Sequence, residues 1–183
     1  MNYFIDITLK SDAEMRENVL MNTVYSKLHK ILFILKSTSI GVSFPQYKVL
    51  FGKVLRIHGD QSYLNELQGL DWLGGIKGYC DISNVLPVPE ITQYRIVSRI
   101  QANMTEAKLR RLIARKSITK DEEKHYKAKM FSQSLNNAYF ELVSSSNGEK
   151  HRRYIQFSDF KDEARVGIFD SFGLSKQATV PWF

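Results

Sequence analysis

Patterns of apolar and polar residues divide the first half of the chain into six expected elements. Residues 3–8 (YFIDIT) alternate apolar and polar side chains, which is typical of a strand with one buried face. Residues 13–35 repeat apolar side chains with a helical period. The expected elements are a strand at 3–8, a helix at 13–35, strands at 40–44 and 54–58, a helix at 61–70 and a strand at 79–86.

The second half begins after Pro87 and Pro89, which restrict the backbone and cannot donate to a strand ladder. The expected elements are a strand at 91–101, a helix at about 105–116, a second helix after Thr119, and a β-hairpin over about 139–157 with Asn147-Gly148 at its turn. The fold class is therefore predicted as α+β. We expect a ferredoxin-like (βαββαβ) domain over residues 1–89 and a smaller domain over 90–183 that carries the helix and the hairpin.

Positive charge is concentrated in residues 94–116. This stretch holds seven basic side chains and one acidic one, and so accounts for six of the seven excess positive charges of the 183-residue chain. On a helix, Lys108, Arg111 and Arg115 share one face, and Leu109 lies on another. A solvated helix face is the alternative interpretation, but such a face normally mixes acids with its bases. The concentration of charge favours a nucleic-acid backbone as partner.

Composition argues against a membrane protein, a secreted protein and a metal-binding protein. An apolar content of 43% is enough for an ordinary core. The chain has no apolar run long enough to span a membrane and no signal-peptide pattern, so we expect a cytoplasmic protein without a membrane partner. A single cysteine and four scattered histidines give no zinc spacing, so we expect no metal and no cofactor.

The strand before the basic helix carries two side chains that could read bases. Arg99 and Gln101 are two residues apart and so point to the same side, and Arg and Gln pair with guanine and adenine edges respectively. Two polar residues on a solvated strand face are the alternative. The aromatic motif of RNA-recognition sheets is missing, so duplex or hairpin RNA held by shape and phosphate contacts fits better.

A nuclease needs either carboxylates that hold metal ions or a base that activates the 2′-hydroxyl of RNA. Asp121, Glu122 and Glu123 are consecutive, so on a helix they diverge around the axis. The metal-free route needs a group that titrates near neutrality, which means a histidine. Spacing alone does not choose among the four candidates, which are His29, His58, His125 and His151.

Several motifs resemble one family. The segments IGVSFP (40–45), RIH (56–58), SRIQA (98–102), the basic helix, and GLSK with VPWF (173–183) are similar to the CRISPR repeat-processing endoribonucleases of subtype I-F. The resemblance covers essentially the whole chain. It implies metal-independent cleavage of precursor CRISPR RNA beside a hairpin, retention of the product, and membership of a multiprotein RNA-guided complex.

The resemblance also implies roles for individual residues. His29 matches the catalytic histidine, Ser144 matches a serine that holds the ribose at the cleavage site, and Phe172 stands where well-known members have an active-site tyrosine. The implied RNA-binding residues are Arg99, Gln101, Lys108, Arg110, Arg111, Arg115, Lys116, Ser146, Asn147 and His151.

The chain departs from the family pattern at several of these positions. Phe172 offers no hydroxyl, so we expect packing and not hydrogen bonding to orient His29. Leu112 replaces an arginine of the helix, His151 replaces a stacking phenylalanine, and Asn147 replaces a threonine. Two alternatives follow: a hairpin-RNA-binding subunit without catalysis, and a ferredoxin-like regulator that binds duplex DNA.

Overall fold

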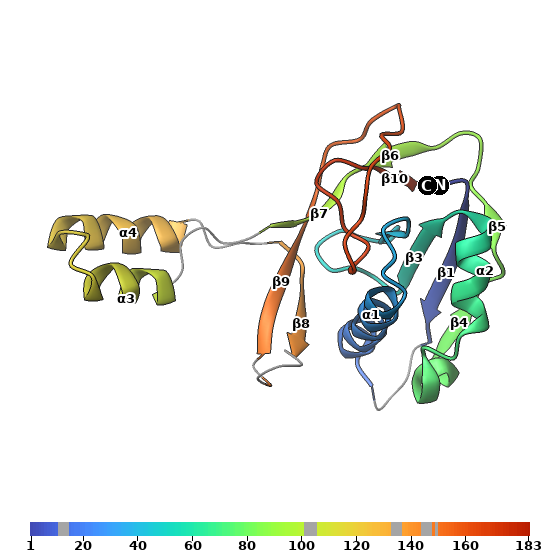
Figure 1. The fold of residues 1–183 in the computed structure, drawn as a ribbon, viewed down its shortest axis with the longest axis horizontal. Coiled ribbons are helices and arrows are strands. Elements are labelled where there is room, and N and C mark those ends of the chain that lie inside the picture. Colours follow the sequence, from blue (N-terminus) through green and yellow to red (C-terminus); the bar gives the residue numbers. More distant parts are fainter. Residues whose placement is uncertain (11–14, 101–105, 133–136, 144–147, 149) are drawn as a thin grey trace.

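A computed structural model describes residues 1–10, 15–100, 106–132, 137–143, 148 and 150–183 (Figure 1). Its helices are α1 (Glu17–Ile34), α2 (Gln61–Gly69), α3 (Glu106–Ala114) and α4 (Lys120–Ser132), with a 3-10 helix η1 (Gly74–Tyr79). Its strands are β1 (Tyr3–Leu9), β2 (Gly41–Ser43), β3 (Val54–Gly59), β4 (Cys80–Ile82), β5 (Leu86–Pro87), β6 (Gln93–Arg95), β7 (Val97–Ile100), β8 (Tyr139–Val143), β9 (Lys150–Phe157) and β10 (Val180–Trp182). All pairings between these strands are antiparallel, which confirms the predicted α+β class.

The first sheet has the strand order β2-β3-β1-β4, and β5 also pairs with β1. Ile5 and Ile7 of β1 are buried, and Asp6 between them points to the opposite face, beside Arg56 of β3. This is the alternation that the sequence predicted for residues 3–8. Helix α2 packs on β1 and β3, and α1 lies between this sheet and the sheet that contains β8 (Figure 1).

Two other sheets come from the second half of the chain, with the orders β7-β9-β8 and β10-β6. The sequence predicted one continuous strand over residues 91–101, and this prediction is wrong because the structure has two strands, β6 and β7, in different sheets. The chain changes sheets at Ile96, whose amide donates to the Ser158 hydroxyl, so that β6 pairs with β10 and β7 pairs with β9. The hairpin of β8 and β9 is confirmed, but Asn147 of the predicted turn lies outside the described residues.

The predicted strand at 79–86 is also interrupted. Its first residue ends η1, and the two short strands β4 and β5 are separated by residues 83–85. The Ser83 hydroxyl accepts a hydrogen bond from the Asp6 amide at 2.9 Å and donates to the Asn84 carbonyl at 2.8 Å. A side chain thus occupies a ladder position, which ends the regular pairing.

One apolar cluster joins the two halves of the chain. Tyr25 and Leu28 of α1 are fully buried, and Phe140, Ile155 and Phe172 from the second half belong to the same cluster. The rings of Tyr25 and Phe140 stack with their centroids 3.9 Å apart. This packing fixes α1, and with it His29, against β8 and the C-terminal segment.

Helices α3 and α4 pack on each other and extend away from the sheets (Figure 1). Leu109 of α3 is buried. Helix α3 ends at Ala114, and after it Lys116 lies in the left-handed region (φ 51°) and the Ser117 amide donates to the Leu112 carbonyl. The helix is therefore shorter than the predicted helix at about 105–116. None of the described helices is long and apolar enough to cross a membrane.

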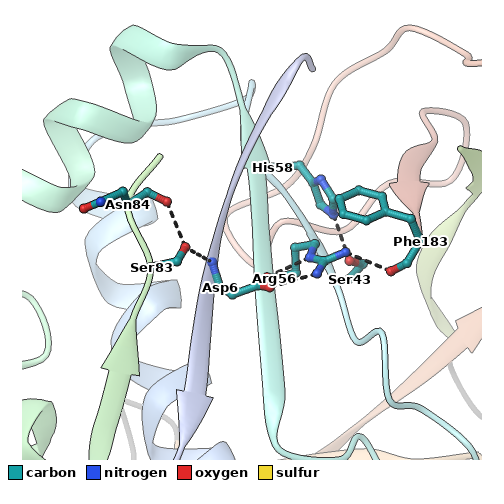
Figure 2. A network of polar contacts seen from close by, with 7 residues as sticks. All are labelled: Asp6, Ser43, Arg56, His58, Ser83, Asn84 and Phe183. Atoms are coloured by element: carbon teal, nitrogen blue, oxygen red, sulfur yellow. Dashed lines mark hydrogen bonds and ion pairs between the residues drawn. The ribbon is translucent and has the colours of Figure 1, made fainter. Parts of the chain in front are cut away.

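A polar network attaches the C-terminal segment to the face of the first sheet that carries Asp6 and Arg56, opposite the face of Ile5 and Ile7 (Figure 2). Arg56 makes two hydrogen bonds to the Asp6 carboxylate, at 2.7 and 2.8 Å, and a third, at 2.9 Å, to the main-chain oxygen of Phe183. Its guanidinium carbon lies 3.9 Å from the centroid of the Phe183 ring. The segment that leads to Phe183 also contains residues 169–175, so this attachment helps to position the candidate site.

His58 lies in the same network and is fully buried, with Nε2 2.8 Å from the Ser43 hydroxyl and Nδ1 without a partner (Figure 2). Burial, together with the nearby Arg56 charge, holds the pKa of His58 well below its usual 6.5. The unfolded chain therefore binds this proton more readily than the folded protein does.

We expect the free energy of unfolding to fall as the pH drops below 6.5, the ordinary histidine value, towards the lower pKa of folded His58. The limiting slope for one such group is about 1.4 kcal/mol per pH unit. Urea unfolding at about pH 7 and about pH 5 would measure it. His58→Gln should flatten this dependence, and an unchanged slope in the variant would contradict the assignment.

Candidate active site and nucleic-acid interface

The imidazole of His29 is held from two directions near the end of α1. Its Nδ1 lies 3.0 Å from the Ser171 carbonyl oxygen, and its ring stacks on Phe172 with centroids 3.4 Å apart and an interplanar angle of 11°. Because a carbonyl oxygen can only accept, neutral His29 carries its proton on Nδ1. Nε2 is then the basic nitrogen, and the ring is half-buried.

The surroundings of His29 favour the neutral base. Burial lowers its pKa below 6.5, and the charges of Arg153 and Lys30 lower it further. The Ser171 carbonyl and the Asp170 carboxylate act in the opposite direction but do not cancel this effect. His29 is therefore mostly unprotonated at neutral pH, as a general base must be.

The loop of residues 170–174 that contacts His29 is itself tightly held. The Asp170 carboxylate accepts hydrogen bonds from the amides of Phe172 and Leu174, at 2.9 and 3.0 Å. Gly173 has φ 69°, and a Cβ there would lie 2.7 Å from Val42 Cγ1. Both the backbone conformation and the space thus require glycine, which fixes the loop against β2.

Tyr25, one turn before His29 on α1, binds the same loop. Its buried hydroxyl donates to the Phe172 carbonyl at 2.9 Å, while His29 donates to the carbonyl of the preceding residue, Ser171. The expectation that packing alone orients His29 is therefore wrong in part. Phe172 contributes packing, and the main chain of Ser171 supplies a hydrogen bond in place of a side-chain hydroxyl.

The other three histidines have different environments. His58 is fully buried in the network behind the first sheet. His125 is exposed on α4 with Nδ1 3.2 Å from the Asp121 carbonyl, and His151 is exposed on β9. Of the four, His29 alone combines a fixed ring, partial exposure and a basic nitrogen that has no hydrogen-bond partner among the described residues.

Most of the predicted RNA-binding side chains are exposed. Lys108, Arg110 and Arg111 lie on α3, Arg115 and Lys116 follow its last residue, Arg99 lies on β7 and His151 lies on β9. Gln101, Ser144, Ser146 and Asn147 lie outside the described residues. The sequence reasoning did not single out Asp170, Ser171 or Arg153. Apart from Phe172, the sequence signal for this cluster is the spacing of Tyr25 and His29, which lie four residues apart and so on one face of a helix.

The fold and the site define a basic α+β protein with a candidate histidine base and a separate cationic helix. The family model described as CRISPR-associated protein (Cas_Csy4) matches residues 4–183, and the chain belongs to this family. Two relatives are named "CRISPR-associated endonuclease Cas6/Csy4". The one from Escherichia coli (strain UTI89 / UPEC) is 34% identical over 184 residues, and the one from Pseudomonas aeruginosa (strain UCBPP-PA14) is 33% identical over 187 residues. Each match covers 100% of both chains.

Proposed function

We propose that this protein is an endoribonuclease that cleaves precursor CRISPR RNA at the base of the repeat hairpin, with His29 as general base. The observation that carries the proposal is the hydrogen bond from His29 Nδ1 to the Ser171 carbonyl, because it leaves Nε2 able to accept a proton. Family membership over residues 4–183 and the two relatives named as endonucleases support the class of reaction and substrate.

In the proposed reaction, His29 Nε2 takes the proton from the ribose 2′-hydroxyl upstream of the scissile phosphate. The resulting oxyanion attacks phosphorus in line, and the bond from phosphorus to the 5′ oxygen breaks. The leaving oxygen takes up a proton from solvent, and protonated His29 releases its proton to solvent, which gives a 5′-hydroxyl and a 2′,3′-cyclic phosphate. No metal ion takes part. Ser144 would position the ribose, and Phe172 holds the imidazole plane.

The proposal divides the chain into a ferredoxin-like domain over residues 1–89, which carries His29, and an RNA-recognition domain over 90–183. The strand order β2-β3-β1-β4 and the two helices after β1 and β3 support the first assignment. In the second domain, the cations of residues 108–116 would grip the stem. Arg99 and Gln101 would read its lowest base pairs, and Ser146, Asn147 and His151 would contact the RNA from the hairpin.

The protein would act in the cytoplasm and remain bound to the mature RNA after one turnover. It would then serve as a subunit of a multiprotein complex guided by that RNA. The exposed cations of α3 support retention, since the cleaved strand still offers the stem phosphates to which they bind.

The test is cleavage of the cognate repeat RNA in excess EDTA. We expect full cleavage, a cyclic phosphate terminus, and no cleavage of an RNA with a single 2′-deoxy substitution at the cut site, which should still bind. A requirement for added Mg²⁺, or cleavage of the 2′-deoxy RNA, would contradict the mechanism.

A second function, a hairpin-RNA-binding subunit without catalysis, is favoured by one observation. Phe172 presents a ring and no hydroxyl beside His29, so the site lacks one polar group that could align the ribose. The same assay separates the two functions. Tight binding of the repeat RNA without cleavage by the wild-type protein would support the second.

A further inference from the structure

Arg153 is a buried cation with no ion-pair partner among the residues that the structure describes. Its residue is 8% exposed, its Nε has no hydrogen-bond partner, and no described carboxylate lies within ion-pair distance of it. Burial and the Arg99 charge lower the pKa of Arg153, and the effects of Tyr25 and Asp170, which raise it, offset this only in part. A buried guanidinium without a paired anion destabilises the folded protein. An anion that binds to it from solvent would remove this cost.

Arg153 lines a groove of about 580 Å³ that is open to solvent. The groove lies between β7, β9 and residues 168–176, and its polar lining residues are Arg99, Arg153, Gln156, Asp170, Ser175 and Lys176. Three cations thus face one carboxylate, and two neutral side chains can complete the hydrogen bonds to an oxyanion. This composition suits a phosphate group.

The groove adjoins the proposed catalytic histidine. The guanidinium carbon of Arg153 and the imidazole of His29 both lie 3.4 Å from the centroid of the Phe172 ring. Two groups at this distance from one ring must occupy its opposite faces, so a single ring separates them. A nucleotide that places its ribose at His29 would bring a neighbouring phosphate within reach of Arg153.

We propose that this groove binds a backbone phosphodiester of the RNA beside the linkage that His29 cleaves, with Arg153 as its principal ligand and Arg99 and Lys176 at its rim. The proposal rests on the proposed function. It adds a substrate contact outside the basic helix and explains why a guanidinium is buried against the ring that orients the base.

The test is a binding experiment with RNA that carries a 2′-deoxy group at the cut site, so that it is not cleaved. A neutral methylphosphonate replaces one phosphate at a time around that site, and affinities are measured for wild type and Arg153→Gln at one salt concentration. We expect one position to weaken wild-type binding roughly tenfold and to have little further effect on the variant. Equal losses in both proteins at every position would overturn the proposal.

Two further variants test whether any loss of binding in Arg153→Gln reflects a lost phosphate contact or a change in the structure around Arg153. Lys176→Gln removes an exposed cation of the groove and leaves the stack of Arg153, Phe172 and His29 unchanged. A methylphosphonate at the same or the adjacent position should have little further effect on the affinity of this variant, which we call coupling. Arg16→Gln removes the same charge before the first turn of α1, about 20 Å from His29 along the helix, and should couple to none. If Arg153→Gln fails to fold, coupling by Lys176→Gln decides the question.

The outcomes also separate this proposal from the proposed function. If coupling is seen but the wild-type protein does not cleave all-ribose RNA, phosphate binding in the groove is supported and the proposed cleavage reaction is contradicted. If the RNA is cleaved but no coupling is seen, only the proposal of phosphate binding in the groove is contradicted. If the wild-type protein does not bind the RNA, both proposals are contradicted.

Discussion

Replacing His29 by alanine should reduce the single-turnover rate of RNA cleavage by about 10²–10⁴-fold. The substitution removes Nε2, the nitrogen that the Ser171 hydrogen bond leaves basic, and with it the route for the 2′-hydroxyl proton. Affinity for the repeat hairpin should change by less than about twofold, because the side chains that would hold the stem lie on other elements. Rates with excess protein and dissociation constants for uncleavable RNA would measure the two effects separately.

The matched control is His125→Ala, since His125 is exposed on α4, with its Nδ1 3.2 Å from the Asp121 carbonyl one turn before it. This variant should cleave at the wild-type rate. The wild-type rate should also rise with pH and level off above a pKa lower than 6.5, because burial favours neutral His29. Cleavage by His29→Ala at the wild-type rate would show that another group takes the proton.

Elements with a strong local pattern could be predicted from the sequence. The helical period before residue 35, the alternation at residues 3–8 and the hairpin arms all correspond to α1, β1, β8 and β9. Strand β10 could not be predicted in this way, because Val180–Trp182 is short and contains a proline. Its pairing depends on β6, which is far away in the sequence. Local pattern carries little information about such long-range pairing.

The candidate site shows the same limit. The four histidines look alike in the sequence, and the contacts that distinguish His29 come from Ser171 and Phe172, with a separation of 142 residues for the hydrogen bond. Family resemblance pointed to His29, whereas the geometry explains how its ring is fixed without a tyrosine hydroxyl. Arg152 and Arg153 are likewise equivalent by residue type. They differ in the side of β9 on which they lie, since Arg153 is buried over the Phe172 ring and Arg152 is exposed.

Neutralising the aligned cations Lys108, Arg111 and Arg115 with glutamine should weaken binding of the repeat hairpin by about 10²-fold near physiological salt. These side chains are exposed and lie on one face of α3 and its final turn, where the Arg115 amide still bonds to the Arg111 carbonyl at 3.0 Å. They span about 10 Å along the axis, enough to meet several successive phosphates. At saturating protein, cleavage should keep the wild-type rate because His29 is untouched.

The salt dependence distinguishes direct phosphate contacts from a loss of net charge. Each lost contact should reduce the slope of log affinity against log salt by about 0.7 to 0.9, so the triple variant should lose between about 2.1 and 2.7. The control replaces Lys124, Lys127 and Lys129 of α4 by glutamine, which removes the same charge from a helix whose acids already neutralise part of it. We expect this control to lose less than about threefold in affinity and to keep its slope. Equal losses in the two triple variants would mean that α3 contributes only general electrostatic attraction, and the stem would then have to be gripped elsewhere.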